Sequence, residues 1–385
     1  MRKVNFLVYV YSFVLFLISP PYFLWGTQIP VLLVIFLFLF SIPQFGIRKN
    51  KNAYISLSLL FIFYLYTIII SARLSIIVCL LHLIVYSIFL LSGDFLSRAF
   101  RCYSLLFSIS LIPSLLVYFC VVWGDVYMDY SIISPLNTIK SYEYIQYPFL
   151  VVSQVSDFVY FRFCAYYDEP GVVGSIASLL LIGNRFNLRL WENWPILIAG
   201  LFSFSLFFYV ILFGYIFLYM NIRSKIYALL CILILLIILK NNEVVDQLVF
   251  GRLKWTDDGL SGDNRTSAFF DQWFQKYIST PTSIVGLGGG ESLKINYGGA
   301  SYKDLIVDYG FVGITLFFTG MFLFYLKLRL YKDYMLVVLL LLCTIYQRPF
   351  VFDYLYMFLL IAIIYNLKVS NKSCMYQIKY SSLRC

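Results

Sequence analysis

Residues 195–220 read PILIAGLFSFSLFFYVILFGYIFLYM, an uninterrupted apolar stretch on which the fold of the whole chain depends. A helix that crosses a bilayer needs about 20 apolar residues, so this stretch is longer than one ordinary span. In its middle, Ser203 and Ser205 flank Phe204, and the chain could turn there. Whether the stretch crosses once or folds back decides on which side of the membrane the rest of the chain lies.

The composition of the chain is that of a membrane protein. Of its 385 residues, 62% are hydrophobic and only 12% are charged, whereas soluble domains carry about 25% charged residues. Water would not tolerate so much apolar surface, but lipid solvates it. Because apolar runs occur nearly throughout, we expect residues 1–385 to form a single all-α polytopic membrane domain.

The basic residues decide how residues 195–220 fold. Seven clusters in the short gaps between apolar runs hold 18 of the 29 basic residues, with only Asp94, Glu192 and Asp333 among them. This placement sets orientation and does not indicate nucleic-acid binding, and the positive-inside rule puts all seven clusters in the cytoplasm. That requires two short spans that turn near Ser203–Ser205, which gives about twelve transmembrane helices with both termini cytoplasmic. The clusters are Arg2/Lys3, Arg48/Lys49/Lys51, Arg98/Arg101, Arg185/Arg189, Arg223/Lys225, Lys327/Arg329/Lys332 and Lys368/Lys372/Lys379/Arg384.

Two long polar segments, about 123–169 and 241–303, then lie together on the opposite, outer side. They hold most of the acidic residues and several isolated arginines. Connections of this length are usually functional or disordered, and their many aromatic residues argue against disorder. We therefore expect the functional site in these two loops, with short amphipathic helices inside them.

The first loop ends in an acidic pair at the start of a helix. Asp168 and Glu169 precede Pro170, which fits the first helical position and places Glu169 at the N-cap. Stabilisation of both acids by the helix dipole is a sufficient structural explanation. Arg162 favours a functional role as well, because ionisable groups at the membrane boundary are usually paired or functional.

The second loop contains Ser261-Gly262-Asp263-Asn264-Arg265, a turn-and-cap sequence that leads into a predicted amphipathic helix. Arg265 lies at the start of this helix, where the dipole disfavours a cation, so it is a candidate ligand for an anion. One face of the helix carries Phe270, Trp273, Phe274, Tyr277 and Ile278.

Three further features have competing interpretations. The glycine-rich segment 286–292 lacks the ending of a P-loop, and we interpret it as a flexible turn, with an anion-binding nest as the alternative. Arg348, between the last two apolar runs, either snorkels or lines a cavity. The single histidine, His82, lies within an apolar run and is expected to pack there. No cluster of His, Cys and Glu predicts a metal site, and no cofactor is expected.

These segments together resemble the O-antigen polymerase (Wzy-type) family, within the superfamily that includes the O-antigen ligases. The likeness covers roughly the last 230 residues, and the order of the motifs along the chain carries it. The motifs are Arg162 with Asp168-Glu169-Pro170-Gly171, Ser203-Phe204-Ser205, Ser261-Gly262-Asp263-Asn264-Arg265, Gly286-Leu287-Gly288 and Asp308-Tyr309-Gly310-Phe311-Val312-Gly313.

The resemblance implies a bacterial inner-membrane glycosyltransferase whose site faces the periplasm. Its substrates are undecaprenyl-diphosphate-linked oligosaccharides, and a growing glycan is transferred onto a new lipid-linked repeat unit without a metal ion. A chain-length regulator protein is a candidate partner besides the membrane lipid. Arginine suits a diphosphate because its planar fork makes charge-assisted, bidentate bonds. The diphosphate is therefore assigned to Arg162, Arg265, Arg348 and Arg252, and the general base to Glu169 or Asp168.

Two other functions fit part of the pattern. A flippase for the same lipid-linked sugars would share the number of spans, but we would expect short outer loops and charges along the spans. The ligases that the resemblance includes use a histidine in the large periplasmic loop, and this chain has none there. The sequence therefore favours a polymerase.

Overall fold

The computed structural model describes most of the chain between residues 2 and 381. Nothing is said below of residues 1, 20, 47–50, 72–75, 134–142, 154–160, 228–229, 231–242, 244–246, 249–250, 252–253, 257–258, 261–265, 297–300, 329, 349 and 382–385.

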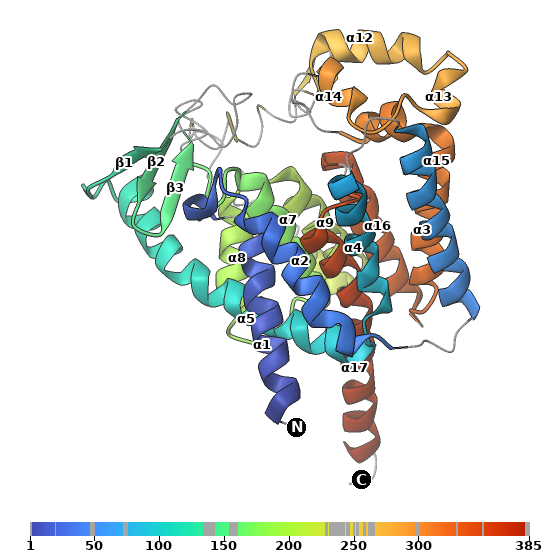
Figure 1. Cartoon of the computed structure of the whole chain (residues 1–385). Coiled ribbons are helices and arrows are strands. Elements are labelled where there is room, and N and C mark those ends of the chain that lie inside the picture. Colours follow the sequence, from blue (N-terminus) through green and yellow to red (C-terminus); the bar gives the residue numbers. More distant parts are fainter. Residues whose placement is uncertain are drawn as a thin grey trace.

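The described residues are mostly helical, as the all-α expectation requires (Figure 1). The helices are α1 (Arg2–Ile18), α2 (Ile29–Ser41), α3 (Lys51–Ile70), α4 (Ile76–Ser87), α5 (Gly93–Tyr118), α7 (Pro170–Gly183), α8 (Asn193–Phe202), α9 (Leu206–Tyr219), α12 (Ala268–Tyr277), α13 (Thr282–Val285), α14 (Glu291–Asn296), α15 (Tyr302–Tyr325), α16 (Tyr331–Gln347) and α17 (Tyr354–Ser381). Short 3-10 turns lie at Tyr22–Leu24, Ile42–Gln44 and Ile88–Leu90, and a π-helical turn at Phe119–Trp123 extends α5.

Two helices in the described part of the chain are long and apolar enough to cross a membrane, Gly93–Trp123 and Tyr302–Tyr325. On length and composition alone, this is a weak sign of membrane association. The other apolar helices there have 10–17 residues, which is short for a full span. The arrangement of about twelve spans therefore stays a prediction.

The stretch 195–220 folds as two short helices, because α8 ends at Phe202 and α9 begins at Leu206. Phe204 takes a positive φ of 47° between them. The Ser203 hydroxyl donates to the Gly200 carbonyl at 2.7 Å and accepts from the Ser205 amide at 3.3 Å. The Ser203 hydroxyl thus binds backbone groups on both sides of the break between the two helices.

The first long loop differs from the expectation of short amphipathic helices. Its described residues form a three-stranded antiparallel sheet in the order β1 (Ser131–Ile133), β2 (Tyr144–Tyr147), β3 (Leu150–Ser153). Tyr144 and Tyr147 are buried while the two residues between them are less so, and Val151 and Val152 are β-branched, which favours strands. The turn residue Phe149 follows Pro148 and has a φ of 62°, the pattern of a type II turn. A second small pair, β4 (Trp255–Thr256) with β5 (Gly259–Leu260), lies in the other long loop.

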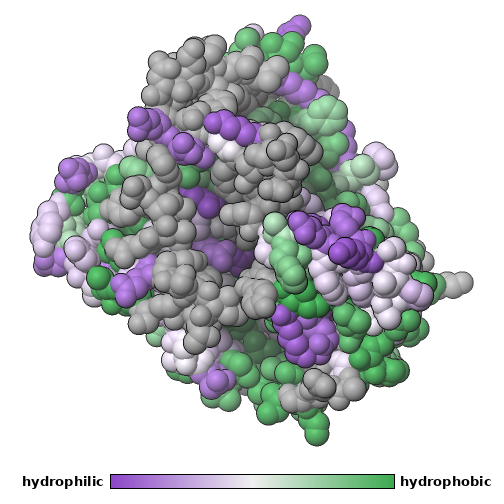
Figure 2. All heavy atoms as spheres, turned by 90° about the horizontal axis from the view of Figure 1, so that it is seen from above, coloured by the Kyte–Doolittle hydropathy of each residue, from purple (hydrophilic) through white to green (hydrophobic). Residues whose placement is uncertain are grey.

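The described parts of both long loops lie at one end of the helix bundle, and α1 begins and α17 ends at the other (Figure 1). Viewed from the loop end, hydrophilic residues lie in several separate groups over the face, and hydrophobic residues are prominent along its lower and right-hand edges (Figure 2).

At the opposite end of the bundle, residues from several of the basic clusters make polar contacts that link neighbouring helices. Arg185 forms an ion pair with Asp333 at 2.9 Å, and the side chain of Asp333 is fully buried. Arg101 donates to Asn366 at 2.9 Å, and Asn366 donates to the carbonyl of Gly183 at 2.8 Å. Helices α5, α7, α16 and α17 therefore meet at this end through specific polar contacts.

Helix α12 lies on the first turns of α15. Its N-cap is Ser267, whose hydroxyl accepts from the Phe270 amide at 3.1 Å. Phe270, Phe274 and Tyr277 are buried against α15 residues. Most of the predicted apolar face therefore packs against α15, but Ile278 is 38% exposed.

Candidate functional site

The acidic pair lies at the start of α7, where the sequence predicted it. Pro170 is the first residue of α7 and Glu169 is its N-cap, but the Glu169 side chain makes no cap hydrogen bond. Its carboxylate instead forms an ion pair with Arg348. Asp168 is partly buried, and its carbonyl accepts from the Tyr144 hydroxyl at 3.2 Å. The Glu169 side chain therefore contacts the residue that follows α16, in addition to lying at the N-terminus of α7.

Arg348 reaches Glu169 because helix α16 ends beside the first turns of α7. Gln347 is the last residue of α16, and its side chain accepts from the Ser175 hydroxyl at 2.9 Å. Arg348 itself is extended, with a φ of −155°. Its guanidinium lies 5.6 Å from the ring centre of Phe350, and 17% of its side chain is exposed. The snorkelling interpretation is therefore wrong, because the arginine pairs with a carboxylate inside the protein.

Arg162 is held at the turn between α8 and α9. Its guanidinium donates to the carbonyls of Ser203 at 3.2 Å and Phe204 at 3.4 Å. This turn packs on α7, since a Cβ added at Gly174 would lie 2.4 Å from the Cβ of Ser205. Two segments thus pack against the first turns of α7. The α8–α9 turn holds Arg162, and the end of α16 carries Arg348. Of the sequence-predicted residues, the structure brings Arg348, Glu169, Asp168 and Arg162 to this one helix end.

Asp353 belongs to the same region and was missed by sequence reasoning. It lies five residues after Arg348, just before α17, and accepts from the Tyr356 amide at 2.9 Å. Burial raises the pKa of its carboxyl, while the backbone amides of Tyr356 and Leu355 and the charge of Arg348 lower it, for a net increase. The signal was available, because an Asp directly before an apolar run is a helix N-cap signature.

Three buried tyrosines surround this region on the inner side. Tyr103, Tyr167 and Tyr356 interact with one another, and none is more than 3% exposed. The hydroxyls of Tyr103 and Tyr167 lie within reach of each other, and that of Tyr356 lies within reach of Ser175. Buried hydroxyls are normally paired, so this cluster is a polar region inside an otherwise apolar bundle.

The glycine-rich segment is an anion nest whose anion comes from the chain itself. The amides of Gly290 and Ser292 donate to the Asp308 carboxylate at 3.0 and 2.8 Å. Gly310 interrupts α15 with φ 63° and ψ −179°, and a Cβ there would lie 2.4 Å from the carbonyl oxygen of Ile284. The interpretation as a plain flexible turn is therefore wrong, since these contacts fix the segment on α15.

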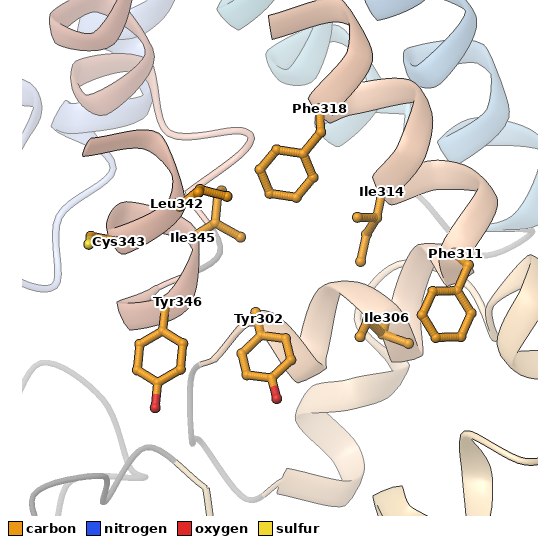
Figure 3. Close-up of a pocket in the computed structure, with 9 residues that line it drawn as sticks. All are labelled: Tyr302, Ile306, Phe311, Ile314, Phe318, Leu342, Cys343, Ile345 and Tyr346. Atoms are coloured by element: carbon orange, nitrogen blue, oxygen red, sulfur yellow. The ribbon is translucent and has the colours of Figure 1, made fainter. Parts of the chain in front are cut away.

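A cavity of about 510 Å³ lies between α15 and α16. Its walls are apolar, and the stacked rings of Tyr302 and Tyr346 lie at one end with both hydroxyls pointing the same way (Figure 3). Tyr346 precedes Arg348 by two residues, so the tyrosine end of the cavity is the end nearer that arginine. The remaining lining residues are Ile306, Phe311, Ile314, Phe318, Leu342, Cys343 and Ile345.

Of the remaining predicted residues, two arginines are outside the part of the chain that the structure describes, and the histidine lies in a helix of the bundle. Arg252 and Arg265, with the Ser261–Arg265 segment, lie outside the described residues. His82 stacks on Phe352 with ring centres 3.6 Å apart, in keeping with a packing role. Within the part of the chain that the structure describes, no group of three or more His, Cys, Asp and Glu side chains could hold a metal ion.

No protein-family model matches the chain. No functionally characterised protein and no solved structure is significantly similar to it either. A functional assignment therefore depends on the residues and contacts described above.

Proposed function

We propose that this chain is a polysaccharide polymerase of the O-antigen type. It would transfer a growing glycan from undecaprenyl diphosphate onto a new lipid-linked repeat unit at the periplasmic face of a bacterial inner membrane. The proposal includes about twelve spans, two of them formed by α8 and α9, and cytoplasmic termini. The reaction needs no metal ion, because arginines neutralise the diphosphate.

The observation that carries the proposal is the contact between Arg348 and Glu169 at the start of α7, with Arg162 held nearby. The cation can bind an anionic leaving group, and the carboxylates are candidate bases. Both chemical roles that glycosyl transfer from a diphosphate requires are thus present at the loop end of the bundle. The ion pair of Arg185 with Asp333 also joins a cation to a carboxylate, but it lies at the opposite end of the bundle from the two long loops.

The chemistry follows from these groups. The bond between the anomeric carbon and the diphosphate oxygen breaks, and the diphosphate leaves with the electron pair. The acceptor oxygen forms the new bond and loses its proton to a carboxylate, for which Glu169 and Asp168 are the candidates from the sequence. Arg348 and Arg162 stabilise the negative charge that develops on the leaving group.

The resting ion pair adds a constraint. Because Arg348 is occupied by Glu169, a diphosphate must compete with that carboxylate. Binding would release Glu169 from its cation and so make it a better proton acceptor, since a nearby opposite charge favours the ionised form. The apolar cavity between α15 and α16 has the character needed for a hydrocarbon chain.

A flippase is the main alternative, and one genetic experiment separates it from a polymerase. Deleting the gene in its host should leave glycans that carry a single repeat unit, because assembly and transport of the unit remain intact. Loss of even that single unit would indicate a flippase or a ligase and would refute the proposal.

A further inference from the structure

The hairpin formed by β2 and β3 is held against the side of α5, well before that helix ends. The carbonyl of Phe149, in the turn of the hairpin, accepts a hydrogen bond from the buried Ser114 hydroxyl. Ser114 lies nine residues before Trp123, the last residue of the apolar helix Gly93–Trp123. At 1.5 Å per residue this is about 14 Å along the helix axis, so even a strongly tilted α5 places the turn below its own end.

The solvent at this level of α5 is therefore the solvent of the hairpin turn. Leu116, two residues after Ser114, is one of the large hydrophobic side chains that α5 exposes. In a chain that crosses a membrane, an exposed leucine in the middle of an apolar helix faces acyl chains. The Phe149 side chain is exposed as well, although it comes from a loop that the sequence predicts outside the membrane.

The composition of the hairpin suits such a position. None of residues 144–153 is charged. Backbone groups without a partner are costly in lipid, and the turn has two features that reduce their number. Pro148 has no backbone N–H, and the Phe149 carbonyl is bound by Ser114.

Exposed aromatic side chains surround the turn. Trp123, Tyr127 and Tyr130 are exposed in the segment that joins α5 to β1. The rings of Tyr130 and Tyr147 lie 5.8 Å apart, which connects this segment to the hairpin. The sheet lies on the outside of the helix bundle beside α5 (Figure 1). Single exposed hydrophobic residues are ordinary, but Trp and Tyr in a group are typical of the boundary between membrane and water.

Two acidic residues limit how deep this surface can lie. Asp125 and Asp129 are exposed in the same connecting segment, and carboxylates are expensive within the hydrocarbon region. Insertion is therefore restricted to the turn and the rings around it. This depth is that of the boundary between headgroups and acyl chains, where amphipathic surface segments bind.

The hairpin is also attached to the acidic segment of the candidate site. The Tyr144 hydroxyl donates to the Asp168 carbonyl at 3.2 Å. The Val151 amide donates to the Ala165 carbonyl at 2.7 Å. A hairpin fixed in the membrane surface would therefore fix the height of Asp168 above it.

We infer that the β2–β3 turn inserts into the outer leaflet of the bilayer, with Phe149 among the acyl chains. Trp123, Tyr127 and Tyr130 lie at the level of the headgroups, so the partner of this surface is the phospholipid membrane itself. The insertion holds the acidic segment near the level at which a lipid-linked diphosphate lies. The inference rests on the membrane orientation in the proposed function and does not depend on glycosyl transfer.

The test places the photo-cross-linking residue p-benzoylphenylalanine at Phe149, Leu116 or Phe269 of the full-length protein. Each variant is reconstituted into liposomes of phosphatidylethanolamine and phosphatidylglycerol and irradiated, and its adducts are identified by mass spectrometry. The three side chains are matched in exposure, at 59%, 63% and 64%. Leu116 is the lipid-facing control on α5, and Phe269 is the control on α12, which lies beyond the bundle at the loop end (Figure 1).

We expect phospholipid adducts at Phe149 and Leu116 in yields at least about 5-fold above the yield at Phe269, because only the first two contact acyl chains. A Phe149 yield no higher than that of Phe269, with adducts present at Leu116, would overturn the inference and leave the proposed function in place. A Phe149 adduct with a second copy of the protein in place of lipid would overturn it too. If Leu116 forms no lipid adduct, the membrane placement of α5 is wrong, and the proposed function fails together with the inference.

Discussion

Replacing Asp333 with Asn should destabilise the protein through Arg185, and the size of the effect follows from burial. The carboxylate is fully buried, pairs with Arg185 at 2.9 Å and also accepts from the Tyr219 hydroxyl. Asparagine can still accept from Tyr219, so the change removes mainly the charge. What remains is a partly buried cation that has lost the Asp333 carboxylate.

Breaking a buried ion pair by removing one partner costs about 3–5 kcal/mol. The Arg185 side chain is 24% exposed, so water can solvate part of the remaining charge. We therefore expect a loss of about 2–3 kcal/mol in the free energy of unfolding, below the range for a fully buried pair. The Arg98–Asp94 pair offers a matched comparison, because its side chains are 41% and 76% exposed. Asp94→Asn should cost less than about 1 kcal/mol.

The assay is equilibrium unfolding of the purified protein in mild detergent, with both variants measured beside the wild type. The double variant Arg185→Met with Asp333→Leu should recover much of the loss, because it removes the unpaired charge together with its partner. Equal effects of Asp333→Asn and Asp94→Asn would refute the reasoning, since the two pairs differ in burial and not in chemistry.

Three other predictions concern the loop end of the bundle. Gly310→Ala should cost several kcal/mol in unfolding, because a Cβ meets backbone at 2.4 Å in a conformation that essentially only glycine adopts. Gly290→Ala also has a positive φ but open space around it, so a similar loss there would contradict the packing argument. Arg348→Lys and Arg265→Lys keep the charge but lose the planar fork, and glycan length near wild type in both would contradict bidentate binding of a diphosphate. Asp353→Asn should stabilise the fold at neutral and higher pH and have little effect at acid pH. The pKa of the Asp353 carboxyl is raised in the folded protein, so the free energy of unfolding falls as that carboxyl ionises. A difference in unfolding free energy that does not change with pH would contradict this.

The positions of most described helices could be predicted from apolar runs and charge. The break at Ser203–Ser205 followed from the distribution of basic residues far from it, because orientation is a property of the whole chain. The first loop could not be predicted as well. Its sheet depends on the pairing of Tyr144–Tyr147 with Leu150–Ser153, and such short strands give little periodic signal.

The candidate site was predictable in its parts but not in its contacts. Sequence placed Glu169 at an N-cap and Arg348 in a tight connection, yet nothing local indicated that the two side chains meet. Asp308 shows the same limit, since the carboxylate that fills the glycine-rich nest lies in another helix. Asp353 was overlooked because it lies inside a connection that otherwise reads as part of an apolar run.

The central claim is chain growth on a lipid diphosphate, and reconstitution tests it most directly. The purified protein would be placed in liposomes with its lipid-diphosphate-linked repeat unit, and both glycan length and free lipid diphosphate would be measured. We predict longer glycans, with one lipid diphosphate released for each new linkage. Movement of the repeat unit across the bilayer without any new linkage would contradict the claim.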